Sequence, residues 1–275
     1  MILYRTKSGW VVEQDGRVNP VEGSLDELLS RDDLHAYFEG LLKAGATSAG
    51  ALHKDDLLAP IGNQEVWAAG VTYLRSRAAR MAESKNAGGG DFYDRVYSAE
   101  RPELFFKSQP EKVVGPGGAV GLRSDATWSV PEPELALVIS PRGEIVGYTI
   151  GNDMSSRDIE GQNPLYLPQA KVYNRSCALG PGILLRREGL PETTRISISI
   201  DRGGEAAFTG ETTLAQMKRK PQELVHYLYF DQSFPQGAFL LTGTGIVPPD
   251  SFTLERGDTV SISIDGIGTL VNPVA

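Results

Sequence analysis

The stretch from Val130 to Lys171 decides the fold, and it reads VPEPELALVIS followed by PRGEIVGYTIGNDMSSRDIEGQNPLYLPQAK. Glu132 and Glu134 stand two residues apart at the head of the apolar run 135–139. Because residues i and i+2 of a strand point to the same face, both carboxylates are expected to project from one side. The run lacks polar alternation, which is typical of a strand buried on both faces, where unpaired carboxylates are costly.

A third carboxylate is expected beside this pair. Residues 141–143 read Pro-Arg-Gly, which is turn chemistry, and residues 144–150 then read as a returning strand that leads to Asp153. Two glutamates and one aspartate without a nearby His or Cys make an all-oxygen site, which suits Mg²⁺, Mn²⁺ or Ca²⁺ and disfavours zinc. Glu-x-Glu pairs are also common on solvated strand faces, so spacing alone leaves both interpretations open.

The motifs around this core resemble those of the fumarylacetoacetate hydrolase superfamily. Its members carry E-x-E on one strand, then G-Y-T-x-x-N-D-x-S-x-R-D, then a lysine ahead of an L-G-P segment. The matching segments here are 132–134, 147–158, Lys171 and 179–181, with further matches at 104–107, 114–117 and 241–244. The resemblance covers about residue 66 to the C-terminus, and it implies that Glu132, Glu134 and Asp153 hold a metal ion.

The resemblance also implies a β-rich α+β fold, in which a mixed β-roll or sandwich forms the catalytic domain. Many short strands, few helices and no internal repeat agree with this class, and the last strands are expected at 252–255 and 260–264. We expect a small N-terminal α+β domain over residues 1–62 and a metal-dependent catalytic domain over residues 63–275. Residues 24–27 form a capping-box pattern, which predicts a helix that begins at Leu25.

One segment departs from the hydrolytic members of the superfamily. Where they read G-x-N-Y-x-x-H-A, with a histidine that activates water, residues 70–79 read GVTYLRSRAA. The chain holds three histidines, and none falls in this segment. The difference counts against hydrolysis of a C–C bond, because that histidine supplies the general base. Arg75, Ser76 and Arg77 are instead candidates for substrate binding. The two arginines are equally compatible with a solvated helix face.

Within the superfamily, the chain is similar to the 2-keto-3-deoxy-pentonate dehydratases of oxidative pentose breakdown. The similarity is carried by residues 70–73, 93–97, 101–107, 152–161 and 163–171. It implies a Mg²⁺-dependent hydro-lyase that converts 2-dehydro-3-deoxy-D-arabinonate to 2,5-dioxopentanoate through a Mg²⁺-stabilised enolate. An acylpyruvate-type C–C hydrolase, a 2-oxo acid decarboxylase and a tautomerase are the alternatives within the superfamily. A metal-dependent binding protein for small acids is the non-enzymatic alternative.

The resemblance extends to the roles of single side chains. Lys171 is the candidate base, because a cation-rich or desolvated setting lowers the pKa of a lysine. Glu103 is the candidate acid that protonates the departing C4 hydroxyl if its side chain enters the site; otherwise it is a strand-end carboxylate. Thr244 is expected to bind the substrate carboxylate, and Lys107 to contribute to substrate binding. Residues 86–100 include the flexible sequence Gly-Gly-Gly and are interpreted either as a lid or as an idle surface loop.

Composition excludes several classes of partner. The 275 residues, 40% hydrophobic and 23% charged, are ordinary for a globular protein. A net charge of −8 without a basic stripe argues against nucleic acid, and no apolar run is long enough for a bilayer. The lack of a signal sequence and the single Cys177, interpreted as a packed small hydrophobe, predict a cytoplasmic location. A small anionic 2-oxo acid and a second copy of the chain, in a homodimer or homotetramer, are the expected partners.

Overall fold

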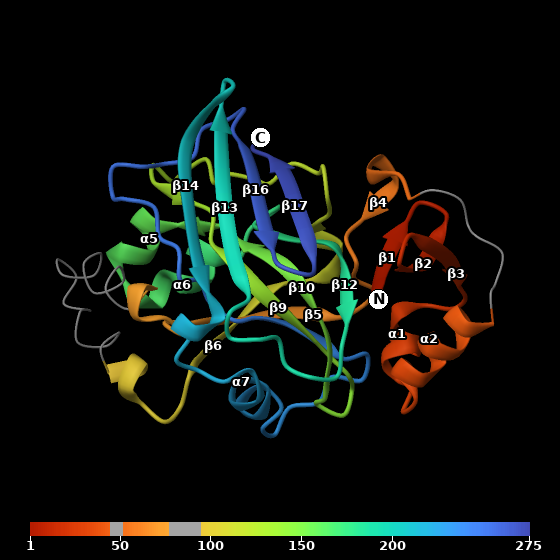
Figure 1. Ribbon diagram of the computed structural model, residues 1–275. Helices are drawn as coiled ribbons and strands as arrows, with labels where there is room; N and C mark the ends of the chain where they lie inside the picture. Colours follow the sequence, from red (N-terminus) through yellow and green to blue (C-terminus); the bar gives the residue numbers. More distant parts are fainter. Residues whose placement is uncertain (45–51, 77–94) are drawn as a thin grey trace.

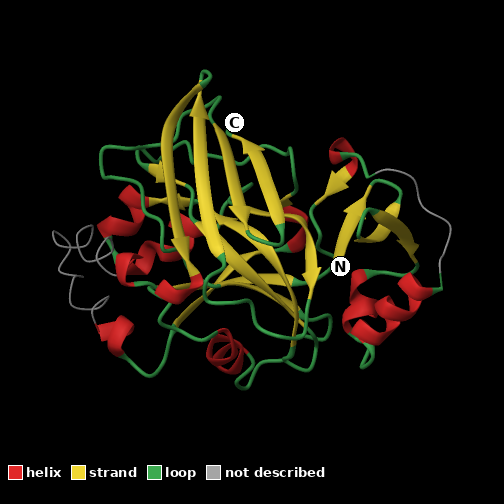
Figure 2. Ribbon diagram, viewed as in Figure 1, coloured by secondary structure: helices red, strands yellow, loops and turns green. Residues whose placement is uncertain are grey.

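The computed structural model describes residues 1–44, 52–76 and 95–275 of the chain. A large mixed sheet forms the centre of the molecule, and a four-stranded antiparallel sheet packs on one of its faces (Figure 1). Helices lie at the periphery, on both sides of the strands (Figure 2). The expected β-rich α+β fold is confirmed. No described helix has the length and apolar character that a membrane crossing requires.

The large sheet joins the N-terminal strands to the central hairpin. Its order is β3-β2-β1-β12-β10-β9-β15-β5-β6, with two short strands, β4 and β7, paired to β1 and β12. Most neighbours are antiparallel, while β15–β5 and β12–β7 are parallel. The bounds are β1 (Ile2–Thr6), β2 (Gly9–Gln14), β3 (Arg17–Val21), β4 (Leu57–Leu58), β5 (Glu65–Gly70), β6 (Glu103–Ser108), β7 (Val113–Val114), β9 (Pro133–Ile139), β10 (Ile145–Asp153), β12 (Cys177–Leu185) and β15 (Ala238–Leu241).

The hairpin β9–β10 lies in the middle of this sheet and is buried on both faces. Leu135, Leu137 and Ile139 of β9 enter the core that the large sheet shares with the four-stranded sheet. Ala136 and Val138 enter a second core on the opposite face, which the N-terminal strands and helices cover. The unbroken apolar run of β9 is therefore explained by burial on both sides.

The smaller sheet alternates clearly between buried and exposed residues. Its order is β14 (Glu205–Thr213), β13 (Arg195–Arg202), β16 (Thr259–Ile264) and β17 (Gly268–Pro273). Ile196, Ile198 and Ile200 point into the core, as their alternation predicts for a half-exposed strand. The strand predicted at 252–255 was wrong. That segment is irregular, because its polar groups are satisfied outside a ladder, including a hydrogen bond from Arg202 to the Thr253 carbonyl.

The N-terminal residues extend the large sheet rather than standing apart from it. Helix α1 (Leu25–Leu29) begins with the predicted capping box, in which the Ser24 hydroxyl accepts from the Glu27 amide and the Glu27 carboxylate accepts from the Ser24 amide. Helix α2 (Leu34–Lys43) follows. Strand β1 pairs with β12, so the hydrophobic core runs through both parts. The domain boundary at residue 62 stays a prediction.

Short elements carry the chain from the end of β10 to the candidate base. They are β11 (Ser155–Ser156), α5 (Arg157–Gln162), η4 (Pro164–Tyr166) and α6 (Leu167–Lys171). Strand β8 (Ser129–Val130) lies earlier in the chain, just before β9. Strand β11 pairs with β8, which directly precedes Glu132. This pairing folds the segment back over the start of β9. Further elements with described bounds are η1 (Lys54–Asp56), η3 (Pro110–Lys112), η5 (Leu214–Gln216) and α7 (Pro221–Leu228). Helix α7 packs against the core that the large sheet shares with the four-stranded sheet.

Candidate metal centre

Three buried carboxylates meet at one end of the central hairpin. Glu132, Glu134 and Asp153 each offer an oxygen within 4.8 Å of the other two, and their exposed fractions are 5%, 1% and 1%. Glu134 lies on β9 opposite Gly151 of β10, so the register of the hairpin places Asp153 next to the glutamates. The structure thus brings together the three residues that the sequence assigned to the metal.

Lys171 lies among these carboxylates. Its Nζ is 2.8 Å from Glu132 Oε2, 2.9 Å from Asp153 Oδ2 and 2.5 Å from Ser155 Oγ. The side chain is fully buried and comes from the last residue of α6. The candidate base is therefore in direct contact with two of the three candidate ligands.

Lys107 lies behind Asp153 and is equally buried. Its Nζ forms an ion pair with Asp153 and donates hydrogen bonds to the backbone carbonyls of Met154 (3.0 Å) and Lys171 (2.6 Å). Among the described residues, those that line the cavity at the centre do not include Lys107. Substrate binding by Lys107 stays a prediction, and its contacts are those of a residue that orients Asp153 and the main chain at Lys171.

Arg157 is a site residue that received no role from the sequence motifs. Its guanidinium donates to Glu132 Oε1 at 2.8 Å and lies 3.9 Å from Glu160, and all three side chains are buried. It stood within the quoted R-D motif, but nothing in its spacing reveals that α5 returns to the start of β9. The β11–β8 pairing creates that contact.

The donor set at this centre suits a divalent cation. Burial raises the pKa of Glu134 well above its ordinary value, and repulsion from Asp153 and Glu132 adds to the rise. A buried all-oxygen set of three carboxylates is a donor set that suits Mg²⁺ or Mn²⁺ and would offset this cost. The residues present therefore fit the metal, and Glu132, Glu134 and Asp153 would hold it.

The loop after β15 fixes the orientation of Glu134. The Gly243 amide donates to Glu134 Oε2 at 2.6 Å. Gly243 has φ +86°, and a Cβ there would overlap the Thr72 hydroxyl and lie 3.0 Å from the Ala69 carbonyl. Only glycine can adopt this backbone conformation at such close range. Thr72 in turn donates to the Thr242 carbonyl at 2.6 Å, which ties the loop to the end of β5.

A narrow cavity opens over Glu132, Asp153 and Lys171. Residues 69–71, Ser76, Phe105, Arg157 and residues 243–244 complete its described lining. Val71 has φ 53° although it is β-branched, a conformation that is costly and that concentrates at functional sites. The cavity wall therefore contains strained backbone close to the carboxylates.

The remaining predicted site residues differ in how close they come to this cavity. Thr244 lines it, with its hydroxyl accepting from the Ile246 amide at 3.1 Å. Ser76 lines it as well, and its hydroxyl donates to the Tyr73 carbonyl at 2.8 Å. Glu103 is half-buried and pairs with Gly70, where a Cβ would overlap the Glu103 carboxylate. The candidate acid thus lies against a residue of the cavity wall.

Arg75 and the described residues 95–100 of the candidate lid do not line the cavity. Arg75 is exposed. Arg77 lies outside the described residues, and so do residues 86–94 of the candidate lid 86–100. Their roles stay predictions.

The histidines and the cysteine lie elsewhere. None of the three histidines of the chain lines the cavity. His35 is on α2, His226 is on α7 and His53 is exposed. Burial raises the pKa of the Cys177 thiol to about 12, so it is protonated at neutral pH. The interpretation of Cys177 as a packed small hydrophobe agrees with its complete burial.

Comparison with known proteins agrees with this geometry. The family described as "Fumarylacetoacetate (FAA) hydrolase C-terminal" matches residues 66–275. The chain belongs to the fumarylacetoacetate hydrolase family.

Individual relatives show which proteins the chain resembles. The chain is 50% identical over 216 residues to the probable 2-keto-3-deoxyxylonate dehydratase of Haloferax volcanii, covering 78% of this chain and 73% of the relative. It is 45% identical over 218 residues to the 2-dehydro-3-deoxy-D-arabinonate dehydratase of Saccharolobus solfataricus, with the same coverage. A solved structure of 2-keto-3-deoxy-D-arabinonate dehydratase, complexed with magnesium and 2,5-dioxopentanoate, matches with a TM-score of 0.84. Its sequence identity is 34%, and the match covers 100% of this chain and 98% of that one.

Proposed function

We propose that this chain is a Mg²⁺-dependent hydro-lyase that dehydrates a 2-keto-3-deoxy sugar acid. The proposed reaction converts 2-dehydro-3-deoxy-D-arabinonate to 2,5-dioxopentanoate. The observation that carries the proposal is the contact of the Lys171 ammonium with Glu132 and Asp153 at a site of three buried carboxylates. The relatives at 45–50% identity are dehydratases of this substrate class, and the solved relative holds magnesium and the dioxopentanoate.

The residues suit loss of water from such a substrate. When bound, Mg²⁺ supplies a Lewis acid that polarises the 2-oxo group and acidifies the C3 hydrogens. Lys171 is the candidate base for the C3 proton, and Glu103 is the candidate to protonate the C4 hydroxyl as it leaves as water. Transfer of a proton from C5 to C3 then moves the new C3–C4 double bond to C4–C5. Ketonisation of this enol leaves the C5 aldehyde.

The remaining predicted residues are proposed to bind the substrate. Thr244 and Ser76 line the cavity and can contact the carboxylate or hydroxyl groups. Arg75, Arg77 and Lys107 stay candidates for attracting the anion. A homodimer or homotetramer, a cytoplasmic location and a place in pentose breakdown are expectations that accompany the proposal.

The absence of histidine from the cavity favours dehydration over hydrolysis. A C–C hydrolase needs a base that activates water, and no histidine of the chain lines this site. A decarboxylase or tautomerase would use the same polarised 2-oxo acid, so the product must be identified directly.

A turnover assay tests the proposal. The purified chain is incubated with Mg²⁺ and 2-dehydro-3-deoxy-D-arabinonate, and the products are identified by mass, with acetylpyruvate in parallel. We expect loss of one water, abolished by EDTA and restored by added Mg²⁺. Cleavage of acetylpyruvate without dehydration, or loss of CO₂, would refute the assignment. Lys112→Met serves as a surface control, because Lys112 is exposed on η3.

A further inference from the structure

A second cavity, of about 220 Å³, lies between the N-terminal unit and the turn end of the central hairpin. Its lining includes Arg31, His35, Arg142 and Arg187, together with Ile145 and Val146 at the start of β10. Val146 is seven residues from Asp153, about 20 Å along the strand. The cavity is therefore separate from the metal centre, although one strand connects them.

His35 supplies an unsatisfied buried polar atom to this cavity. The side chain is 8% exposed, and its Nε2 has no hydrogen-bond partner among the described residues. Burial lowers the pKa of His35 and the positive charge of Arg187 adds to this effect, while a hydrogen bond to the Val146 backbone and the charges of Glu188 and Glu39 act in the opposite direction. Buried polar atoms of this kind nearly always have a partner, which can be a ligand. A hydroxyl group of a ligand can form a hydrogen bond with Nε2 in either tautomer of the ring, because a hydroxyl both donates and accepts.

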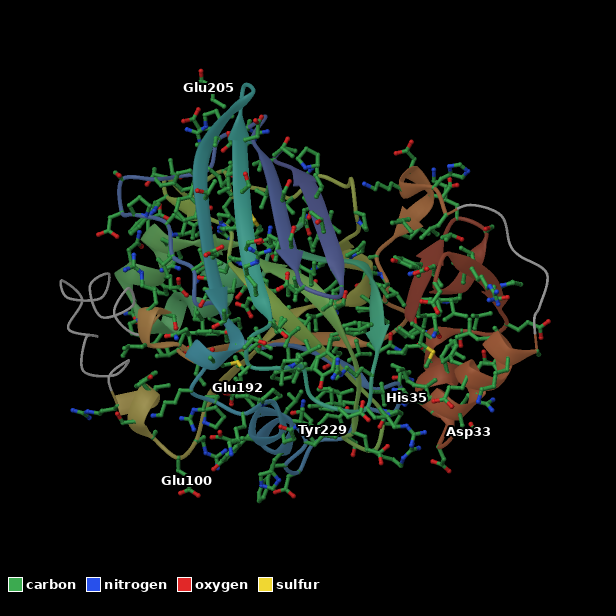
Figure 3. All side chains as sticks on the ribbon, viewed as in Figure 1. Asp33, His35, Glu100, Glu192, Glu205 and Tyr229 are labelled. Carbon is green, nitrogen blue, oxygen red and sulfur yellow. The ribbon has the colours of Figure 1, made fainter. Side chains whose placement is uncertain are left out.

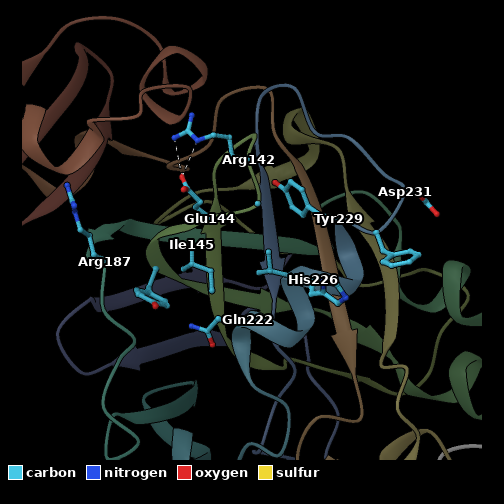
Figure 4. A pocket seen from close by; sticks show the side chains of 12 residues that line it. Arg142, Glu144, Ile145, Arg187, Gln222, His226, Tyr229 and Asp231 are labelled. Carbon is cyan, nitrogen blue, oxygen red and sulfur yellow. Dashed lines mark hydrogen bonds and ion pairs between the residues drawn. The ribbon is translucent and has the colours of Figure 1, made fainter.

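Three arginines line the same cavity, together with the carboxylates of Asp32 and Glu144. Arg142 is shared between Asp32 (2.6 Å) and Glu144 (3.1 Å), and Arg31 pairs with Asp33 (2.9 Å). Arg187 is exposed and forms no ion pair with any described residue. In Figure 4, Arg187 stands near the Arg142–Glu144 pair, where the N-terminal unit borders a larger groove of about 630 Å³ over α7. One guanidinium is thus available for an anion.

The start of α2 also borders this cavity. Residues 34 and 35 line the cavity and are the first two residues of the helix, and the side chain of the N-cap residue Asp33 makes no capping hydrogen bond. The first amides of an uncapped helix are open donors, and the helix dipole favours an anion there. Figure 3 shows Asp33 and His35 together on the N-terminal unit, with His35 on the side toward Tyr229 of the core.

We propose that this cavity binds a small hydroxylated carboxylate of the size of a sugar acid. Arg187 and the α2 amides would hold the carboxylate, and His35 Nε2 would bond a hydroxyl. The volume is below that of sites for drug-sized ligands and suits a five-carbon acid. A bound acid would bridge the N-terminal unit and β10. The proposal goes beyond the dehydratase activity and does not depend on it.

Calorimetric titration of the full chain in EDTA tests the proposal, because the metal centre is then unable to take the acid by chelation. The probes are D-arabinonate, hydrogen phosphate and sulfate. We expect saturable binding of one arabinonate per chain. His35→Phe should lower the affinity for arabinonate about tenfold and leave sulfate unchanged, because it removes one hydrogen-bonding atom. Arg187→Ala should lower the affinity for every probe that binds, by about tenfold or more, because each loses the guanidinium.

Arg256→Ala is the matched control, since Arg256 is also exposed but lies outside the cavity lining. Circular dichroism confirms that each variant is folded. Absence of saturable arabinonate binding at millimolar concentration would overturn the proposal, and so would binding that Arg187→Ala leaves unchanged. Binding of phosphate without arabinonate would overturn the sugar-acid assignment. Binding that requires Mg²⁺ and disappears in Glu134→Gln would place the acid at the metal centre instead.

Discussion

The ammonium group of Lys107 donates a hydrogen bond of 2.6 Å to the backbone carbonyl of Lys171. One buried lysine thus fixes the main chain from which the other projects. The same ammonium pairs with Asp153, so β6, the end of β10 and the end of α6 are held at one point. The candidate base and a candidate metal ligand are positioned relative to each other before any substrate arrives.

Lys171→Met should abolish most of the turnover while leaving the fold intact. Loss of a general base lowers kcat by about 100-fold to 10,000-fold. Because Lys171 competes for Glu132 and Asp153, the variant should also bind Mg²⁺ more tightly. Steady-state kinetics and calorimetric Mg²⁺ titration measure the two effects. Near-full turnover in Lys171→Met would reject its role as base.

Lys107→Met should lower both kcat and Mg²⁺ affinity by about tenfold to 100-fold, the usual effect of removing a group that orients a ligand. The reason is that Asp153 loses its buried partner and the Lys171 carbonyl loses its donor. The matched control is Lys112→Met, which removes an exposed lysine a few residues away. A rise in KM with unchanged kcat would instead indicate that Lys107 contacts the substrate.

Gly243→Ala should destabilise the protein and weaken Mg²⁺ binding together. The left-handed conformation costs about 1–2 kcal/mol for a residue with a Cβ, and the overlap with Thr72 adds about 1–3 kcal/mol. Gly203→Ala is the control. Gly203 also has a positive φ (+65°), so alanine is strained there, but nothing lies within 4 Å of the position that its Cβ would take. Denaturant unfolding and Mg²⁺ titration check both variants. Equal losses of stability would show that the close approach at Gly243 does not matter.

Mg²⁺ should raise the thermal midpoint of the wild type, because it binds only the folded carboxylate set. Saturation at about 100 times the dissociation constant adds about 2.7 kcal/mol. Glu134→Gln should remove this effect. In EDTA, however, Glu134→Gln should unfold at a higher temperature than the wild type, because a buried, repelled carboxylate becomes neutral. Thermal scans with and without Mg²⁺ test this, and a lower midpoint of the variant in EDTA would contradict it.

Low pH should remove the stabilisation that the Asp258 carboxylate gives to the folded protein at the junction of β13 and β16. Burial alone would raise the pKa of Asp258, but hydrogen bonds from Arg202 (2.8 Å to each oxygen) and from the Glu255 amide outweigh it and lower that pKa. A carboxyl with a lowered folded pKa stabilises above its unfolded pKa of about 3.9, and the stabilisation is lost as pH falls through the folded value.

Asp258→Asn should therefore cost about 2 kcal/mol at pH 7, and the difference from wild type should shrink in acid. Urea unfolding at a series of pH values measures it. Glu211→Gln is the control, because its 4.0 Å pair with Arg195 is largely exposed and contributes little. A pH-independent difference between Asp258→Asn and wild type would refute the role of the ionised carboxylate.

Local patterns predicted much of this molecule. The capping box at Ser24 and the apolar run of β9 specify a helix start and a doubly buried strand, because each depends on neighbours in the sequence. The three carboxylates followed from strand parity and a short turn. The order of the family's motifs then favoured a metal site over a solvated strand face.

Contacts between segments that are distant in the sequence could not be predicted from it. The bond between Arg157 and Glu132 spans 25 residues and depends on how β11 pairs with β8. The motif that contains Lys107 gave no indication that its ammonium contacts backbone carbonyls and Asp153. Residues 252–255 have a strand-like composition, but their polar groups bond to side chains and loops outside a ladder. Such partners are set by tertiary packing and cannot be read from periodicity.

The position of β9 in the sheet has a consequence for how the protein loses activity. Strands covered on both faces exchange their amide hydrogens only when the whole domain opens, whereas edges and loops open separately. Glu134 and the backbone that leads to Asp153 belong to this slowest-opening segment. Fraying at the β3 edge therefore leaves the candidate metal ligands assembled, whereas fraying at the β6 edge would displace Glu103 and Lys107 from the site. Thermal inactivation should accordingly follow the opening of the β6 edge rather than that of the β3 edge.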